Sequence, residues 1–143
     1  MEQRSPQFGY RDVFYPRIAV VTDQATAAQR LAPGVIVVIA AAKTAKMLRF
    51  LCPCGCGETI TVNLMERVGK AWDLSYTPHR GVSLWPSVWL DVGCQSHFIV
   101  RNNTARLLHG RMPKMTEQQE AEWWSTLPAQ APLESRHRFD ATG

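Results

Sequence analysis

Three of the four cysteines in this chain lie within five residues, and this cluster constrains the fold more than any other feature of the sequence. They are Cys52, Cys54 and Cys56 in the segment CPCGCG, and the fourth is Cys94 in the segment GCQSH. Cysteines two residues apart do not bridge each other easily, because a disulfide needs Cα and Cβ positions that this step does not supply. Thiolates on a tight Gly/Pro turn do converge on one point, and Zn²⁺ accepts four of them in a tetrahedron at about 2.3 Å. The sequence therefore predicts a zinc site formed by these four cysteines.

The commonest structural zinc pattern pairs two C-x-x-C elements, and this chain departs from it. Two alternatives therefore stay open: free buried cysteines, or a disulfide from Cys94 to one of the clustered three. His97 is an alternative ligand in place of one clustered sulfur. Four sulfurs leave no position for water, which makes the zinc structural. With His97 in place of a sulfur, a water site opens and metal-assisted chemistry becomes available.

Composition favours a single globular domain. The chain has 143 residues, of which 45% are hydrophobic and 20% charged. The net charge is +4 and the pI about 9.1, but Lys and Arg are scattered, so a nucleic-acid footprint is not evident. The N-terminus has no apolar signal-peptide core, and the longest apolar stretch, 35–42, is too short to span a bilayer. We therefore expect a cytoplasmic protein with reduced thiols, a setting that favours metal over disulfide.

The expected fold class is α+β, mainly antiparallel β-sheet with a zinc knuckle and a C-terminal helix. Strands are predicted where β-branched or alternating apolar residues cluster, at 17–21, 35–39, 47–51, 59–64, 72–76, 82–90 with a break at Pro86, 97–101 and 104–108. Strands 47–51 and 59–64 flank the cysteine turn and form a hairpin with the metal at its tip. These pieces suggest an antiparallel meander. A polar turn is expected at 43–46, and Asp23 is expected to cap a short helix that ends at Leu31.

Both ends of the chain carry aromatic side chains that we expect to dock on the sheet. Residues 1–16 are expected to form an arm, pinned to the body by Phe8, Tyr10, Phe14 and Tyr15. Thr116 begins a capped helix, placed at 115–126, in which Trp123 and Trp124 provide the docking surface. The predicted domain is therefore 1–127, and the Pro/Ala/Arg-rich end at 128–143 is expected to be loosely ordered.

A set of short motifs occurs in one order: LCPCGCG at 51–57, then Trp72, SLWPS at 83–87 and CQSHFIV at 94–100. Over roughly residues 35–108 this order resembles a small bacterial domain-of-unknown-function family, number 6527. Members of that family are encoded beside a ubiquitin-like modifier, E1-like and E2-like enzymes, and often a JAB-type metalloprotease. The resemblance implies that this chain works in such a pathway, with the ubiquitin-like protein, its conjugates and E1-like or E2-like enzymes as partners. It also implies a serine-peptidase-like activity that trims the modifier or removes it from targets.

A serine-type site needs a nucleophile, a base and an orienting group, and one predicted hairpin holds candidates for all three. The candidates are Ser87, Ser96, His97 and Asp91. If Asp91 pairs across the turn with His97, Ser87 lies four residues further along its strand, roughly 13 Å away. Only a bulge or bend then joins Ser87 to His97, and Pro86 is the kind of residue that sits at one. Ser96 and His97, as neighbours in a strand, point to opposite faces.

We therefore predict Ser87 as the nucleophile and His97 as its base, with Ser96 as the alternative nucleophile. Backbone N–H groups of the loop at 93–95 are the predicted oxyanion donors, and the peptide tail of the modifier is expected to add along an exposed strand edge. The alternative function is a non-catalytic zinc-knuckle adaptor that binds the modifier or an E2-like enzyme. A nucleic-acid-binding zinc module is a weaker alternative, because the basic residues do not cluster. No membrane partner is expected.

Overall fold

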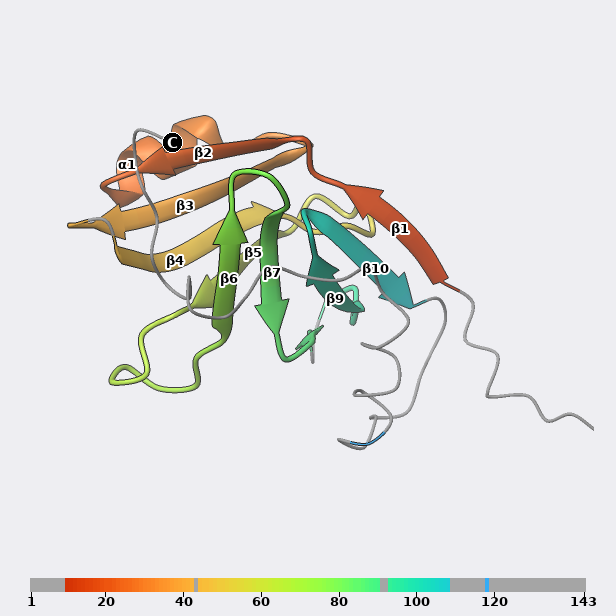
Figure 1. The fold of residues 1–143 in the computed structure, drawn as a ribbon. Helices are drawn as coiled ribbons and strands as arrows, with labels where there is room; N and C mark the ends of the chain where they lie inside the picture. The colour runs from red at the N-terminus through yellow and green to blue at the C-terminus, as the bar shows by residue number, and fades with distance from the viewer. Residues whose placement is uncertain (1–9, 43, 91–92, 109–117, 119–143) are drawn as a thin grey trace, which may run out of the picture.

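The computed structural model describes residues 10–42, 44–90, 93–108 and 118, and these residues form three β-sheets and one short helix (Figure 1). The elements follow one another as β1 Tyr10–Phe14, β2 Arg17–Val21, α1 Gln24–Arg30, β3 Val35–Ala41, β4 Thr44–Leu51, β5 Thr59–Asn63, β6 Asp73–Thr77, β7 Gly81–Trp85, β8 Val88–Trp89, β9 His97–Arg101 and β10 Thr104–Leu108. All strand pairs but one are antiparallel within this described part. The prediction of a mainly antiparallel fold is confirmed.

The first half of the described chain forms a four-stranded sheet in the order β2-β3-β4-β5. β2 and β3 are parallel, because α1 carries the chain back along the sheet between them (Figure 1). α1 begins after Asp23, whose carboxylate accepts a hydrogen bond from Thr26 N at 2.7 Å. The sheet face beneath α1 is apolar, and Val37 is fully buried there. The predicted cap and short helix are confirmed, whereas the predicted antiparallel meander is wrong at the β2–β3 pair.

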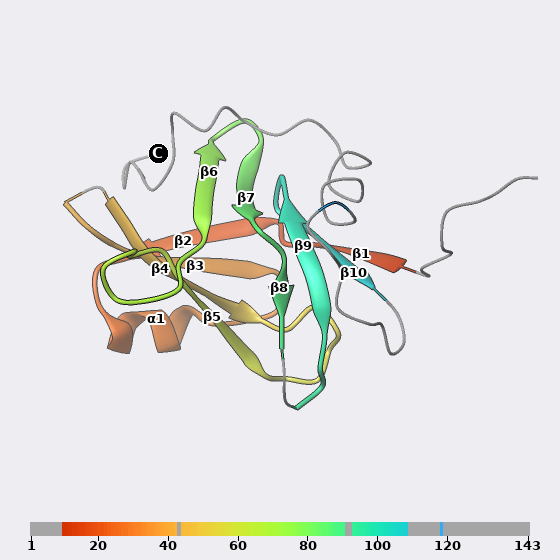
Figure 2. The same ribbon diagram turned by 90° about the horizontal axis from the view of Figure 1, so that it is seen from below.

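A second four-stranded sheet has the order β1-β10-β9-β8 (Figure 2). Its edge strand β1 comes from the segment predicted as an arm. Tyr15, which follows β1, is buried as predicted, but Tyr10 and Phe14 are 52% and 61% exposed. Val13 packs against the core, so the alternation of side chains along the strand turns Tyr10 and Phe14 to the opposite face. The prediction that Phe14 anchors the arm in the core is therefore wrong, whereas the exposed Tyr10 ring contacts Arg106 of β10, whose Cζ lies 4.0 Å from the ring centroid.

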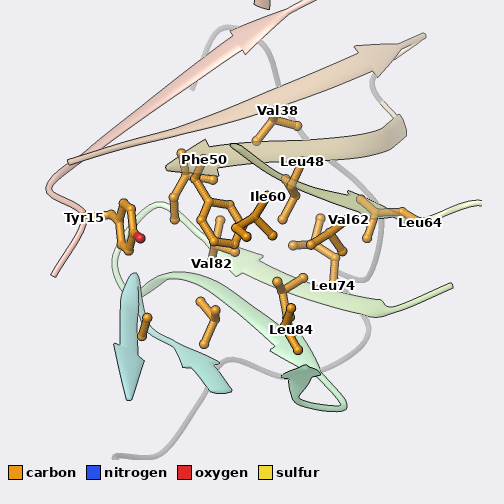
Figure 3. Packing of buried hydrophobic residues seen from close by; sticks show 14 of the residues in the cluster. Tyr15, Val38, Leu48, Phe50, Ile60, Val62, Leu64, Leu74, Val82 and Leu84 are labelled. Carbon is orange, nitrogen blue, oxygen red and sulfur yellow. The ribbon is translucent and has the colours of Figure 1, made fainter. Parts of the chain in front are cut away.

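The main hydrophobic core lies between these two sheets and the β6–β7 hairpin (Figure 3). Phe50 of β4 packs edge to face against Tyr15 and against Phe98 of β9, with ring centroids 5.5 Å and 6.0 Å apart. On the β7 side, Asn103 Oδ1 accepts a hydrogen bond from Val82 N at 2.7 Å, and Asn103 N donates to Val82 O at 2.8 Å. These contacts hold β4, which leads into the cysteine segment, at a fixed position relative to β9, which begins with the predicted base.

Most predicted strands have a counterpart in the structure. The strand predicted at 82–90 breaks at Pro86 into β7 and β8, as expected, and the peptide bond between Trp85 and Pro86 is cis. The turn predicted at 43–46 is misplaced, because β4 already starts at Thr44 and the chain turns earlier, at Ala42, which has a φ of 52°.

Several predictions fall on residues that the structure does not describe. The C-terminal helix at 115–126, including Thr116, Trp123 and Trp124, lies outside the described residues, as do Phe8 and the end at 128–143. Among the described residues, no helix is long and apolar enough to cross a membrane.

Candidate active site and metal site

The β4–β5 hairpin carries the three clustered cysteines in the loop that joins its strands. Cys52 N donates to Glu58 O at 2.8 Å, and Gly55 N donates to Cys52 O at 3.1 Å, so the loop is a closed turn. Gly55 and Gly57 have φ angles of 90° and 88°, in a backbone region that glycine enters without steric penalty. The turn therefore brings the three thiol side chains close together.

Cys94 reaches the same place from the loop between β8 and β9. Leu90 N donates to Ser96 O at 2.9 Å and joins the two sides of this hairpin. The four cysteine sulfurs all lie within 4.8 Å of one another, and Cys52 Sγ is 3.5 Å from Cys54 Sγ and 3.6 Å from Cys94 Sγ. Sulfurs at the corners of a tetrahedron around Zn²⁺ lie about 3.8 Å apart, since each Zn–S bond is about 2.3 Å. The cluster can therefore hold a metal ion.

Two of the alternative interpretations, a disulfide and a His97 ligand, do not match this geometry. All four cysteines are free, although only Cys52 is buried, and the closest sulfur distances of 3.5 and 3.6 Å far exceed the roughly 2.05 Å of a disulfide bond. The group of metal-ligating side chains found here contains only cysteines, while His97 contacts Ser87 instead. Neither the disulfide nor the substitution of His97 for a sulfur is present in the structure.

The crowded thiols differ in how readily they lose a proton. Burial raises the pKa of Cys52 to about 12. Burial also acts to raise the pKa of Cys54, but hydrogen bonds from Ser96, Cys56 and Cys52 together outweigh it and lower that pKa to about 6. The cluster therefore places its first negative charge on Cys54, while burial keeps a proton on Cys52. A bound divalent cation would stabilise the thiolate form of all four side chains, since metal binding displaces the thiol protons.

Ser87 and His97 meet beside the short β8–β9 ladder. Ser87 Oγ is 2.9 Å from His97 Nε2, and the two residues are only 7% and 4% exposed. In the ladder, Trp89 pairs with His97. Ser87 comes two residues before Trp89 and shares its face, so it lies one diagonal step from His97. A serine hydroxyl within hydrogen-bond reach of an imidazole nitrogen is the arrangement in which the imidazole can take the hydroxyl proton.

The pairing of Asp91 with His97 considered above is wrong. The partner of His97 is Trp89, and the hydrogen bond from Leu90 N to Ser96 O follows the same register. The register therefore differs by two residues from the expected one. Ser87 and His97, which an Asp91–His97 pairing would hold roughly 13 Å apart, are instead joined by a hydrogen bond. Asp91 itself lies outside the described residues.

Two tryptophans, neither of them predicted as a site residue, hold this pair in place. Trp72 Nε1 donates to Ser87 O at 3.1 Å. The Trp89 ring stacks on the His97 ring, with centroids 5.3 Å apart and an interplanar angle of 19°. A sequence signal existed for both: Trp72 belongs to the ordered motif set, and Trp89 shares a strand face with Ser87. The hydrogen bond fixes the backbone of Ser87, and the stack fixes the plane of the imidazole.

Ser96 contacts the cysteines. Its Oγ is 3.0 Å from Cys94 Sγ and 3.6 Å from Cys52 Sγ, and the residue is 7% exposed. The next residue, His97, points to the other face of β9, as the alternation of a strand requires. The structure therefore brings Ser96 and the four cysteines together at one site and Ser87 and His97 at a second site nearby.

Comparison with protein-family models identifies a match over residues 22–108 to the family described as bacterial ubiquitination-like system serine protease (BubE). The match covers more than half of the chain and includes both sites. No curated protein and no solved structure matches the chain. The family match confirms the resemblance that the ordered motifs suggested.

Proposed function

We propose, from the fact that this chain belongs to the BubE family of bacterial ubiquitination-like system serine proteases, that Ser87 is its nucleophile and His97 its general base. The observation that carries this proposal is the 2.9 Å contact between Ser87 Oγ and His97 Nε2. The proposed substrate is the C-terminal tail of a ubiquitin-like modifier, which the protease trims before conjugation or releases from a target. E1-like and E2-like enzymes of the same system are the further proposed partners.

In the proposed reaction, Ser87 Oγ attacks the carbonyl carbon of the scissile peptide bond while His97 Nε2 takes the hydroxyl proton. His97 then gives this proton to the leaving amine as the tetrahedral intermediate collapses, which leaves an acyl ester on Ser87. A water molecule that loses its proton to His97 hydrolyses the ester and restores the free hydroxyl. Trp72 and Trp89 keep the two reacting groups in register through their contacts with Ser87 O and the imidazole ring.

Backbone N–H groups at 93–95 are the proposed oxyanion donors. This loop carries Cys94 and ends just before His97, and Gly93 and Gln95 have φ angles of 69° and 56°. The loop passes close to the Glu58 side chain, because a Cβ added at Gly93 would lie 2.9 Å from Glu58 Oε1. β8 is the outermost strand of its sheet, so its open edge is the proposed place for the modifier tail to add as an extended strand.

The proposed metal is a structural Zn²⁺ held by Cys52, Cys54, Cys56 and Cys94. Four thiolates complete a tetrahedral coordination and leave no position for water or substrate. The bound ion would join the β4–β5 loop to the loop that precedes His97. We expect purified protein to contain about one zinc per chain by metal analysis. A zinc content below half an equivalent, with no loss of fold on chelation, would count against this assignment.

Variants of the two proposed catalytic residues test the function. The test substrate is a ubiquitin-like modifier from a bacterial ubiquitination-like system, extended past its terminal glycine, and the products are identified by mass spectrometry. Ser87→Ala and His97→Gln are each expected to lower kcat by on the order of 10⁴-fold or more, with zinc content and Tm nearly unchanged. Ser75→Ala removes the hydroxyl of another buried serine, in β6, and is expected to cleave like the wild type.

A fluorophosphonate probe tests the nucleophile without any protein substrate. The probe is expected to label Ser87 in the wild type and to label neither Ser87→Ala nor His97→Gln, because it reacts only with an activated hydroxyl. A wild-type protein that binds the modifier, does not cleave it and takes no label would support the adaptor function instead.

A further inference from the structure

We propose that Ser96 is a positioning residue whose hydroxyl donates a hydrogen bond to a metal-bound thiolate and so couples the metal site to His97. The first half of this proposal stands on the cysteine cluster alone. The second half, the coupling to His97, rests on the proposed function.

The Ser96 hydroxyl lies where two separate segments of the chain meet. Cys94 Sγ, 3.0 Å away, comes from the loop between β8 and β9, and Cys52 Sγ, 3.6 Å away, comes from the β4–β5 loop. Ser96 is 7% exposed, so water has little access to replace these contacts. A single hydroxyl therefore bridges the two loops that the metal joins.

The chemistry of the ligands decides the direction of the hydrogen bond. In the thiol form, the Cys52 S–H can donate to Ser96 Oγ. A metal-bound cysteine is a thiolate and has no proton to give, so the Ser96 O–H becomes the donor. Cys94 Sγ is the nearer acceptor. Four thiolates around one Zn²⁺ carry a net charge of −2, which such a donor stabilises, as Glu58 N already does for Cys56 Sγ at 3.4 Å.

The backbone of Ser96 links this hydrogen bond to the proposed catalytic pair. Its carbonyl accepts from Leu90 N at 2.9 Å, which is the contact that closes the β8–β9 hairpin. The next residue is His97, whose Nε2 lies 2.9 Å from Ser87 Oγ on the opposite face. Because Ser96 and His97 are consecutive, a hydroxyl fixed on the thiolates also limits where the imidazole can lie.

This assignment differs from the role of alternative nucleophile that the sequence suggested for Ser96. A nucleophilic hydroxyl must reach a base, and the only side-chain atoms to which the described contacts join Ser96 Oγ are cysteine sulfurs. His97, the proposed base, contacts Ser87. Loss of the Ser96 hydroxyl is therefore expected to weaken metal binding first and to slow cleavage through misplacement of His97.

The matched variants Ser96→Thr and Ser96→Val test the metal half. The two side chains have nearly the same shape, but only threonine keeps the hydroxyl. Zn²⁺ affinity is measured by competition with a chromophoric chelator, and the thiolate environment by the absorption spectrum of the Co²⁺-loaded protein. Ser96→Val is expected to bind Zn²⁺ about 10–100-fold more weakly than Ser96→Thr and to shift the Co²⁺–thiolate bands. Equal affinities and superimposable Co²⁺ spectra would overturn the proposal.

Ser96→Ala is the second variant, in case the larger side chains prevent folding. It is expected to show the same loss of Zn²⁺ affinity relative to the wild type, and an unchanged affinity would again overturn the proposal. At saturating Zn²⁺ its kcat is expected to fall about 10-fold, with Ser87 still labelled by the fluorophosphonate probe. If Ser96→Ala is as inactive as Ser87→Ala while Zn²⁺ affinity is intact, Ser96 is the nucleophile and the proposal is wrong. If the wild type does not cleave the modifier, the proposed function fails. The measurements of Zn²⁺ affinity and Co²⁺ spectra still test whether the Ser96 hydroxyl donates to a metal-bound thiolate.

Discussion

Tyr15→Phe removes one hydroxyl at the point where β4 enters the cysteine loop. The hydroxyl donates to Leu51 O at 2.7 Å, and Tyr15 is 3% exposed. Burial raises the pKa of Tyr15 above its usual value, so the hydroxyl keeps its proton and remains a donor. Phenylalanine retains the ring and its edge-to-face contact with Phe50 at 5.5 Å. The substitution therefore isolates the contribution of one hydrogen bond.

The expected loss of stability from Tyr15→Phe follows from the surroundings of that bond. A hydrogen bond contributes about 0.5–1.5 kcal/mol, and a part-buried carbonyl that loses its partner adds a small penalty, so we expect a loss of about 1–2 kcal/mol. For a domain of this size, the loss corresponds to a Tm lower by about 3–8 °C. Because Leu51 directly precedes Cys52, the variant is also expected to release its metal to a chelator faster than the wild type.

Urea unfolding of the metal-loaded protein, followed by circular dichroism, measures this loss. Tyr10→Phe is the matched control, because the same atom is removed from a ring that is 52% exposed, and its effect should stay within about 0.5 kcal/mol. Equal losses in the two variants would refute the reasoning. So would a Tyr15→Phe protein whose free energy of unfolding and metal release match the wild type.

Four other perturbations have defined outcomes. Trp72→Phe deletes the donor to the carbonyl of Ser87 and is expected to lower kcat about 5-fold at unchanged zinc content, since such a bond contributes about 1 kcal/mol. Steady-state kinetics should also show Trp89→Leu slower than Trp89→Phe, which keeps a ring to stack on His97. Titration with a chelator is expected to abolish cleavage before the far-UV circular dichroism of the sheets changes. A hydrogen bond from its helix N-terminus lowers the pKa of Asp23, so the stability that this cap adds is present above about pH 4 and is lost as the pH falls through the lowered value. Asp23→Asn should make the free energy of unfolding, measured by urea unfolding from pH 6 to pH 2, fall less steeply as the pH decreases.

The local half of the candidate site could be predicted from the sequence. Thiolates that share a metal must converge, so cysteines two residues apart on a Gly-rich turn define their own hairpin without knowledge of the rest of the fold. The alternation at 59–64 predicted the strand that follows, and Ile60, Val62 and Leu64 are buried as expected. Signals of this kind depend on neighbours in sequence and not on which strands pair.

The pairing of distant strands could not be predicted, and the geometry of the proposed catalytic pair depended on it. β8 is two residues long, so its side-chain pattern has too few members to define a register with β9. The entropy of closing a loop changes slowly with its length, so the sequence did not distinguish a hairpin in which Asp91 pairs with His97 from one in which Trp89 does. The exposure of Tyr10 and Phe14 has a related cause, because the face that a strand turns to the core depends on its partners.

Strand alternation explains how one hairpin serves two sites. Ser96 directly precedes β9 and its side chain contacts cysteines that border the core, whereas His97, the first residue of β9, points toward Ser87. The two residues are consecutive and share one planar peptide bond, so a displacement of one side chain also shifts the other. The ladder that holds Ser87 near His97 contains only two residue pairs, and a metal on Cys94 would restrain its open end. The aromatic contacts of Phe50 in the core lie outside this hairpin loop, so loss of the metal is expected to impair catalysis more than it impairs the fold.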